Sequence, residues 1–150
     1  MNSRQFSLAL SMATETHAGT NDRGGKPYIL HPLRIMMRLR TDDLHLMALA
    51  LMHDVIEDST ISFKELAEQG FSEEFIADLR LLTKAPGSDY FEYIEAMKGN
   101  RRALLVKEQD LRDNSDITRL KGVSEKDVAR MVKYQKAFMM VRGFLSELDR

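Results

Sequence analysis

The chain contains no cysteine, and it has only three prolines and eight glycines among its 150 residues. The absence of cysteine excludes a disulfide framework, a thiolate zinc site and a cysteine nucleophile. Any metal site must therefore be built from histidine, aspartate or glutamate. Most of the glycines and prolines fall between periodic segments, which is the pattern of helices joined by short loops.

An excess of charge of either sign is also absent. The 22 lysines and arginines are balanced by 23 aspartates and glutamates, which gives a formal net charge of −1. The chain as a whole therefore creates no field that would attract a nucleic-acid backbone or an anionic membrane surface. We expect no nucleic-acid partner.

Long apolar runs are missing as well. The longest, Leu46 to Met52, is far shorter than the roughly 20 residues that span a bilayer. The N-terminus lacks a basic segment followed by an apolar one. We therefore expect no membrane partner and a cytoplasmic protein. The length and the 43% hydrophobic content are sufficient for a single domain over residues 1–150 with a core of its own.

Helical periodicity runs through nearly the whole chain. Apolar residues recur at three- and four-residue spacing between positions 43 and 56. This spacing predicts one helix with a wide buried face. Thr41 or Asp42 is suited to cap its start, because a short polar side chain can accept a hydrogen bond from a free backbone amide.

Capping signals and shorter patterns mark the other helices. Ser62 with Glu65 has the pattern of a capping box, and Ser124 with Asp127 gives a similar start for the last helix. No strand pair is recognisable, so the predicted fold is all-α, a compact multi-helix bundle. The remaining helices are expected at about 5–18, 32–40, 72–83, 89–98 and 101–113.

Four polar residues, His53, Asp54, Glu57 and Asp58, close the otherwise apolar helix predicted at 43–56. On a period of 3.6 residues, His53 lies one turn before Glu57, and Asp54 lies one turn before Asp58. An imidazole beside a carboxylate suits Mn²⁺, Fe²⁺ or Zn²⁺ and leaves the two later residues as acids or bases. The alternative is a solvated helix end, and the His-Asp pair alone does not separate the two.

Two distant segments supply further ligands. A glycine-rich turn leads to Pro32, which suits the first turn of a helix and places His31 at that helix start. Asp110 lies in an apolar helix, where an unpaired carboxylate would be costly. Together with His53 and Asp54, these residues would form a site of two histidines and two carboxylates with coordination positions left for water and substrate.

Residues near the glycine-rich turn are candidates for substrate contacts. Arg23 and Lys26 flank Gly24-Gly25 and could offset the charge of phosphates. Tyr28 either stacks on a nucleotide base or packs between helices. His17 has three open roles, as a metal ligand, a substrate contact or a hydrogen-bonding residue at a helix end, whereas His45 is interpreted as an ordinary polar residue.

Three blocks of the chain together resemble the HD-domain metal phosphohydrolases, which are named for their His-Asp doublet. The resemblance is specifically to the hydrolase domain of the bifunctional RelA/SpoT enzymes and to their small stand-alone relatives. With Leu82-Thr83-Lys84 between them, the blocks extend the match over residues 5 to 120. The blocks are Thr16 to Pro32 with its Pro-Tyr-x-x-His-Pro pattern, Leu51 to Ser59 with His-Asp-Val-Ile-Glu-Asp, and Val106 to Asp110 with Asn114.

The resemblance implies an HD-domain fold and a manganese-dependent hydrolase that releases pyrophosphate from the 3′ position of guanosine tetra- or pentaphosphate. A nucleotide is thus the implied substrate, and the oligomeric state is left open. By motif position, Glu57 and Asp58 match the catalytic acidic pair, and Asn114 matches a polar residue on the substrate side. The family's metal ligands match His31, His53, Asp54 and Asp110.

Two departures from the family pattern concern the substrate. Where the alarmone hydrolases have Gly-Gln-x-Arg-Lys, with an arginine that packs on the guanine, this chain has Asp22 at the arginine position. The third block reads Leu111-Arg112-Asp113-Asn114 in place of Arg-Leu-His-Asn. Base recognition must therefore differ, since an acid offers no planar cation.

The departures leave alternatives open. The alternatives are a hydrolase of another nucleotide or of a phosphate monoester, a metal- and nucleotide-binding module without turnover, and a purely structural helical domain. With no room for a synthetase domain in 150 residues, we expect it to degrade an alarmone and not to make one.

Overall fold

The computed structural model describes residues 1–150 as nine α-helices and one short 3₁₀ helix, with no β-strand. An isolated bridge between Asn21 and Pro27 is the one β-type pairing. The predicted all-α bundle is thereby confirmed. The helices are α1 (Ser3–His17), α2 (Leu30–Arg38), α3 (Leu44–Met52), α4 (Val55–Asp58), α5 (Phe63–Glu68), α6 (Glu73–Leu82), α7 (Tyr90–Glu95), α8 (Arg101–Asn114), the 3₁₀ helix η1 (Ile117–Arg119) and α9 (Glu125–Leu148).

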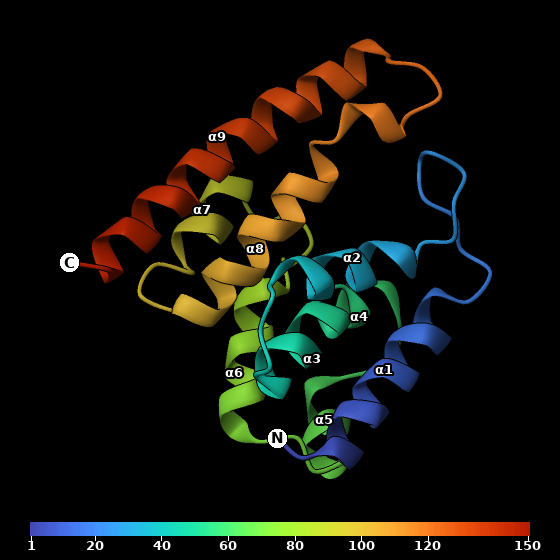
Figure 1. Ribbon diagram of the computed structural model, residues 1–150, viewed down its shortest axis with the longest axis vertical. Helices are drawn as coiled ribbons and strands as arrows, with labels where there is room; N and C mark the ends of the chain where they lie inside the picture. Colours follow the sequence, from blue (N-terminus) through green and yellow to red (C-terminus); the bar gives the residue numbers. More distant parts are fainter.

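Helix α3 is the centre of the core. It packs against α1, α2, α6 and α8, and Figure 1 shows it between α1 on one side and α8 with α9 on the other. A helix that is apolar all round is stable only when it is covered on every side. Its buried residues are Leu46, Ala48, Leu49, Ala50, Leu51 and Met52. None of the helices is long and apolar enough to cross a membrane.

The single helix predicted over 43–56 is wrong, because the chain turns at His53 and Asp54 between α3 and α4. His53 Nδ1 lies 2.7 Å from the carbonyl oxygen of Ala50, and the Asp54 backbone departs from helical geometry with ψ near −4°. The side chain of His53 is buried at this turn, and that of Asp54 is partly buried. Neither predicted cap, Thr41 or Asp42, begins the helix, because the Asp43 carboxylate accepts hydrogen bonds from the amides of His45 and Leu46.

Other boundaries agree closely with the sequence. Both capping boxes are present, at Ser62 for α5 and at Ser124 for α9. Helix α2 begins at Leu30, so that Pro32 lies in its first turn as predicted. It ends at Arg38 and not at position 40, because Arg40 has a φ of 48° and a left-handed residue cannot continue a helix.

The loop between α1 and α2 lies beside the segment that joins α8 to α9 (Figure 1). Asp22 in this loop is 3.0 Å from the guanidinium of Arg119. Gly24 packs so closely that a Cβ at this position would lie 2.3 Å from the Arg119 carbonyl oxygen. Only glycine fits there, so the loop is held against η1 by both a charge pair and a close backbone contact.

His45 is not an ordinary polar residue, because it belongs to a buried network that joins α3, α6 and α8. Its Nε2 atom is 2.8 Å from the Asp78 carboxylate, which is only 2% exposed. Asn100 and Arg102 each donate to Asp78 at 2.6 Å. Burial alone would raise the pKa of Asp78, but the hydrogen bonds from Arg102 and Asn100 outweigh it and lower that pKa.

Replacing Asp78 with Asn should lower the free energy of unfolding by about 3 kcal/mol at neutral pH, because the buried carboxylate that pairs with Arg102 and His45 loses its charge. The depressed pKa means that the carboxylate stabilises the fold above its unfolded pKa of about 3.9 and ceases to do so as pH falls through the folded value. The difference between wild type and Asp78→Asn in urea denaturation should therefore shrink from pH 5 to pH 2. A constant difference would contradict this, and the exposed Asp42→Asn serves as control.

Candidate active site

The structure brings together the four residues predicted to bind a metal. His31 comes from the first turn of α2, His53 and Asp54 from the turn between α3 and α4, and Asp110 from the middle of α8. His31, His53 and Asp54 offer ligand atoms that all lie within 4.8 Å of one another. Asp110 Oδ1 is 3.0 Å from Nε2 of His31 and 3.5 Å from Nε2 of His53.

The hydrogen bonds of the two imidazoles leave their Nε2 atoms free for a metal. His31 Nδ1 lies 2.6 Å from Asp113 Oδ2, and His53 Nδ1 lies 2.7 Å from the Ala50 carbonyl oxygen. When Nδ1 carries the proton, Nε2 presents a lone pair. Both Nε2 atoms are buried and lie 3.0 to 3.8 Å from carboxylate oxygens of Asp54 and Asp110, but none of these contacts has the geometry of a hydrogen bond. Two imidazole nitrogens and two carboxylates fit a divalent transition metal.

The charges of the cluster keep its carboxylates ionised. Burial alone would raise the pKa of Asp110, but the Lys107 ammonium, 2.8 Å away, and the histidines hold that pKa well below its usual range. The Asp54 carboxylate is likewise held at a lowered pKa against the effect of burial, chiefly by His53 at 3.1 Å. Both side chains are therefore anionic at neutral pH and ready to bind a cation.

Asp113 anchors His31 and is a residue that the sequence analysis did not assign to the site. It is fully buried, and its oxygens lie 2.8 to 2.9 Å from the guanidinium nitrogens of Arg34, Arg38 and Arg119. Burial alone would raise the pKa of Asp113, but hydrogen bonds from His31 and Arg34 hold it well below its usual value. Its position one turn after Asp110 on α8 was the one feature of the sequence that could have indicated a role at this site.

Tyr28 orients one of the candidate ligands. Its hydroxyl donates to Asp54 Oδ2 at 2.5 Å, and its ring lies between those of His17 and His31, with centroids 4.6 and 5.5 Å away. Of the two predicted roles, packing between helices is therefore present. His17 is 3% exposed, and its Nε2 atom is also buried without a partner.

Two clefts adjoin the cluster. The first, here called the loop cleft, has a volume of about 560 Å³ and is lined by the α1–α2 loop, His31 and residues of η1 and α9. The second, the lysine cleft, has a volume of about 430 Å³. Tyr28 and Asn114 line both clefts, so the candidate ligands lie where the clefts meet. The lysine cleft is lined by Asp54, Asp110, Lys84, Lys107 and Lys133 among others.

The predicted substrate residues differ in their placement. Arg23 lines the loop cleft, and Asn114 donates to Asp110 Oδ1 at 2.9 Å while facing both clefts. Lys26 lines neither cleft: its side chain is exposed, and its backbone amide donates to Asp22 Oδ1 at 2.9 Å. Its proposed contact with phosphate is therefore not supported by its position.

The two acidic residues after the doublet face different surroundings. Asp58 lines the loop cleft, whereas Glu57 accepts a hydrogen bond from the backbone amide of Lys84 at 2.5 Å. Burial raises the pKa of each carboxyl group, and the negative charge of the neighbouring Asp54 adds to the effect at both. A carboxyl with a raised pKa is suited to transfer a proton near neutral pH.

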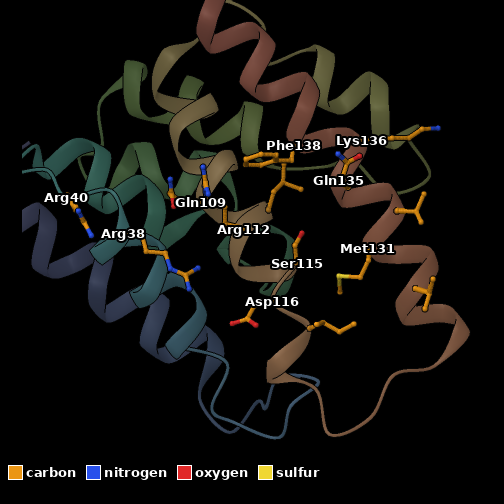
Figure 2. Close-up of a pocket in the computed structure, with 14 residues that line it drawn as sticks. Arg38, Arg40, Gln109, Arg112, Ser115, Asp116, Met131, Gln135, Lys136 and Phe138 are labelled. Atoms are coloured by element: carbon orange, nitrogen blue, oxygen red, sulfur yellow. The ribbon is translucent and has the colours of Figure 1, made fainter.

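A larger groove of about 1430 Å³ lies on the other side of α8. Figure 2 shows Arg38 and Arg40 on one side of it and Met131, Gln135 and Lys136 of α9 on the other. None of the candidate ligands lines this groove. Arg38 also pairs with Asp113, while Asp116 and Met131 line both this groove and the loop cleft.

Comparison with known proteins relates the chain to one group of enzymes, although no protein-family model matches it. It is 28% identical to the guanosine-3′,5′-bis(diphosphate) 3′-pyrophosphohydrolase of Aquifex aeolicus over 120 residues, which cover 73% of this chain and 17% of that protein. It is 32% identical to the bifunctional (p)ppGpp synthase/hydrolase SpoT of Escherichia coli over 113 residues, which cover 73% of this chain and 16% of that protein. The chain thus spans less than one fifth of the length of these curated relatives.

A solved structure of a metazoan SpoT orthologue, which is described as hydrolysing ppGpp, has the same fold. It superposes with a TM-score of 0.76 at 23% identity, and the match covers 99% of this chain and 94% of that one. At this identity the likeness establishes the arrangement of the helices.

Replacing Asp113 with Asn should weaken divalent-metal binding by roughly 10- to 100-fold, because the partner that orients His31 loses its charge. The free energy of unfolding should fall by about 3 kcal/mol, since three guanidinium groups lose their shared carboxylate. Calorimetric titration with Mn²⁺ and urea denaturation measure the two effects.

The matched control is Glu108→Gln. Glu108 is also buried on α8 and pairs with Arg112 and Arg142, but it contacts no histidine. This variant should lose stability and keep its metal affinity. If Asp113→Asn bound Mn²⁺ as tightly as the wild type, the role given to Asp113 would be wrong.

Proposed function

Because the chain is a relative of the RelA/SpoT-type hydrolases with an HD-domain fold, we propose that it is a divalent-metal-dependent phosphohydrolase acting on a nucleotide. Guanosine 3′,5′-bis(diphosphate) is the leading substrate, with release of its 3′-pyrophosphate. The observation that carries this proposal is the pair of buried, unpartnered Nε2 atoms of His31 and His53 beside two ionised carboxylates at the junction of two clefts.

His31, His53, Asp54 and Asp110 are the residues proposed to hold the ion. Their mixed nitrogen and oxygen donors suit Mn²⁺, which is also the metal that the resemblance implies. A bound divalent ion lowers the pKa of a water molecule and polarises a phosphoryl oxygen. The neighbouring Tyr28 and Asp113 fix the orientation of Asp54 and His31, so that little reorganisation is needed when substrate arrives.

Asp58 and Glu57 have different proposed roles. Asp58 faces the loop cleft with a raised pKa, so its carboxylate is placed to accept a proton from the attacking water and to return one to the leaving group. Glu57 holds the backbone of Lys84 and thereby positions the segment that brings the Lys84 ammonium to the lysine cleft. Glu57 is therefore proposed as a positioning residue.

The two clefts suggest which part of the nucleotide each would accept. Lys84 and Lys133 line the lysine cleft and have no carboxylate partner, so they are free to bind a pyrophosphate. The loop cleft offers Arg23, Tyr28 and Asn114 to a nucleoside. A pyrophosphate leaving group can contact both Lys84 and Lys133, whereas a single phosphate would contact fewer of these groups. This favours release of pyrophosphate over hydrolysis of a monoester.

A base other than guanine is a second candidate. Asp22 stands at the family's arginine position, and its carboxylate is turned to Arg119 at 3.0 Å. No planar cation therefore replaces the missing platform at that position. A panel of nucleoside 3′-diphosphates with different bases, assayed with Mn²⁺ and again with a chelator, separates the two candidates.

Asp58→Asn should reduce kcat for Mn²⁺-dependent pyrophosphate release by roughly 10²- to 10⁴-fold while the metal content stays unchanged, because the lost group transfers a proton. Asp54→Asn should lose both metal and activity, because it removes a ligand. Metal analysis and pyrophosphate release measure the two properties, with Asp42→Asn as the control for an exposed acid. Full turnover in Asp58→Asn, or release that persists with chelator, would contradict the proposal.

A further inference from the structure

The loop cleft is lined by more acidic than basic side chains, which is unexpected for a site that binds phosphates. Four carboxylates and three guanidinium groups face it. With a neutral His17 and with His31 bound to a metal, the side chains that line the cleft carry a net negative charge. The carboxylates are those of Asp22, Asp58, Asp116 and Asp127, and the guanidinium groups are those of Arg23, Arg119 and Arg130.

Two of the three cations are already neutralised. Arg119 is 2.8 Å from Asp113 and 3.0 Å from Asp22, so its charge is shared between two carboxylates. Arg130 is paired with Asp127 on the same helix. Arg23 is exposed and has no ion-pair partner, which leaves it as the single cation of the cleft that is free to bind an anion.

The lysine cleft has the opposite character. Lys84 and Lys133 have no ion-pair partner, and the ammonium of Lys133 lies over the rings of Tyr90 and Tyr134 at 4.7 and 5.5 Å from their centroids. Only Lys107 is paired, with Asp110 at 2.8 Å. Free positive charge is therefore concentrated on one side of the candidate metal site.

Resting on the function proposed above, we propose that the loop cleft disfavours every 5′ phosphate beyond the first. Guanosine 3′,5′-bis(diphosphate) would then be hydrolysed, but less efficiently than the guanosine 3′-diphosphate that carries a single 5′ phosphate. The 3′-pyrophosphate would bind at the lysines, and the rest of the nucleotide would then extend into the loop cleft. There the 5′ substituent meets one free cation, Arg23, and the unpaired carboxylates of Asp58 and Asp116. A first 5′ phosphate has a partner, whereas a second or third is repelled.

The test compares three substrates that share guanosine and the 3′-diphosphate and carry a 5′-mono-, di- or triphosphate. At a fixed free Mn²⁺ concentration, kcat/KM for pyrophosphate release should fall by roughly three- to tenfold for each phosphate beyond the first. Raising the NaCl concentration should bring the kcat/KM values of the three substrates closer together, because salt screens repulsion between exposed charges. If kcat/KM rises or stays constant as the number of 5′ phosphates increases, the inference is wrong.

Variants of the loop cleft identify the charges responsible. Asp116→Asn removes one carboxylate and keeps an oxygen to accept from the Thr118 amide, which Asp116 now binds at 3.1 Å. It should raise kcat/KM for the 5′-di- and triphosphates more than for the monophosphate. Arg23→Gln should lower kcat/KM for the monophosphate. Asp42→Asn, with the same change in net charge outside both clefts, should leave all ratios unchanged, and identical effects of Asp42→Asn and Asp116→Asn would refute the mechanism.

Binding of guanosine 5′-mono-, di- and triphosphate separates this inference from the proposed function, because these compounds need no turnover. Calorimetry on the Mn²⁺-loaded wild type should give the tightest Kd for the monophosphate. That order supports the inference even if no pyrophosphate is released, in which case only the proposed function fails. Tighter binding of the triphosphate would overturn the inference alone, and absence of both binding and hydrolysis would overturn both.

Discussion

The structure depends on placing two imidazoles and two carboxylates in the interior of an apolar helical bundle. Buried charges of this kind are destabilising unless each has a partner. Here the partners form a chain of contacts in which three arginines hold Asp113, Asp113 holds His31, Lys107 holds Asp110 and Tyr28 holds Asp54. The Nε2 atoms of His31 and His53 have no hydrogen-bond partner, and both lie beside the carboxylates of Asp54 and Asp110.

The two sides of the cluster differ in charge. Two free ammonium groups lie on one side, and a cleft with paired arginines and extra carboxylates lies on the other. Asp22 contributes to this asymmetry twice, because it neutralises Arg119 and also brings the α1–α2 loop against η1. Asp22, which stands where the family has an arginine, therefore affects both the local fold and the charge that a substrate encounters.

Much of the fold and of the candidate site could be predicted from the sequence, because local patterns encode them. Helical spacing and capping boxes predicted most of the helices. The motifs and their spacing predicted His31, His53, Asp54 and Asp110 as metal ligands. The turn at His53 was missed, since it is set by contacts with Ala50 and Tyr28 and not by periodicity.

The partners that lie far apart in the sequence could not be predicted in the same way. The pairing of Asp113 with three arginines, of His45 with Asp78 and of Asp22 with Arg119 joins segments from different helices. Lys26 was predicted to contact phosphate because it flanks the Gly24-Gly25 turn together with Arg23, yet it lines neither cleft. Such long-range pairings depend on the assembled fold.

The most direct test of the central claim is anomalous diffraction from a crystal of the Mn²⁺-loaded protein. One peak bounded by Nε2 of His31, Nε2 of His53 and the carboxylates of Asp54 and Asp110 is expected, and a fully occupied peak elsewhere with none at this position would contradict the claim.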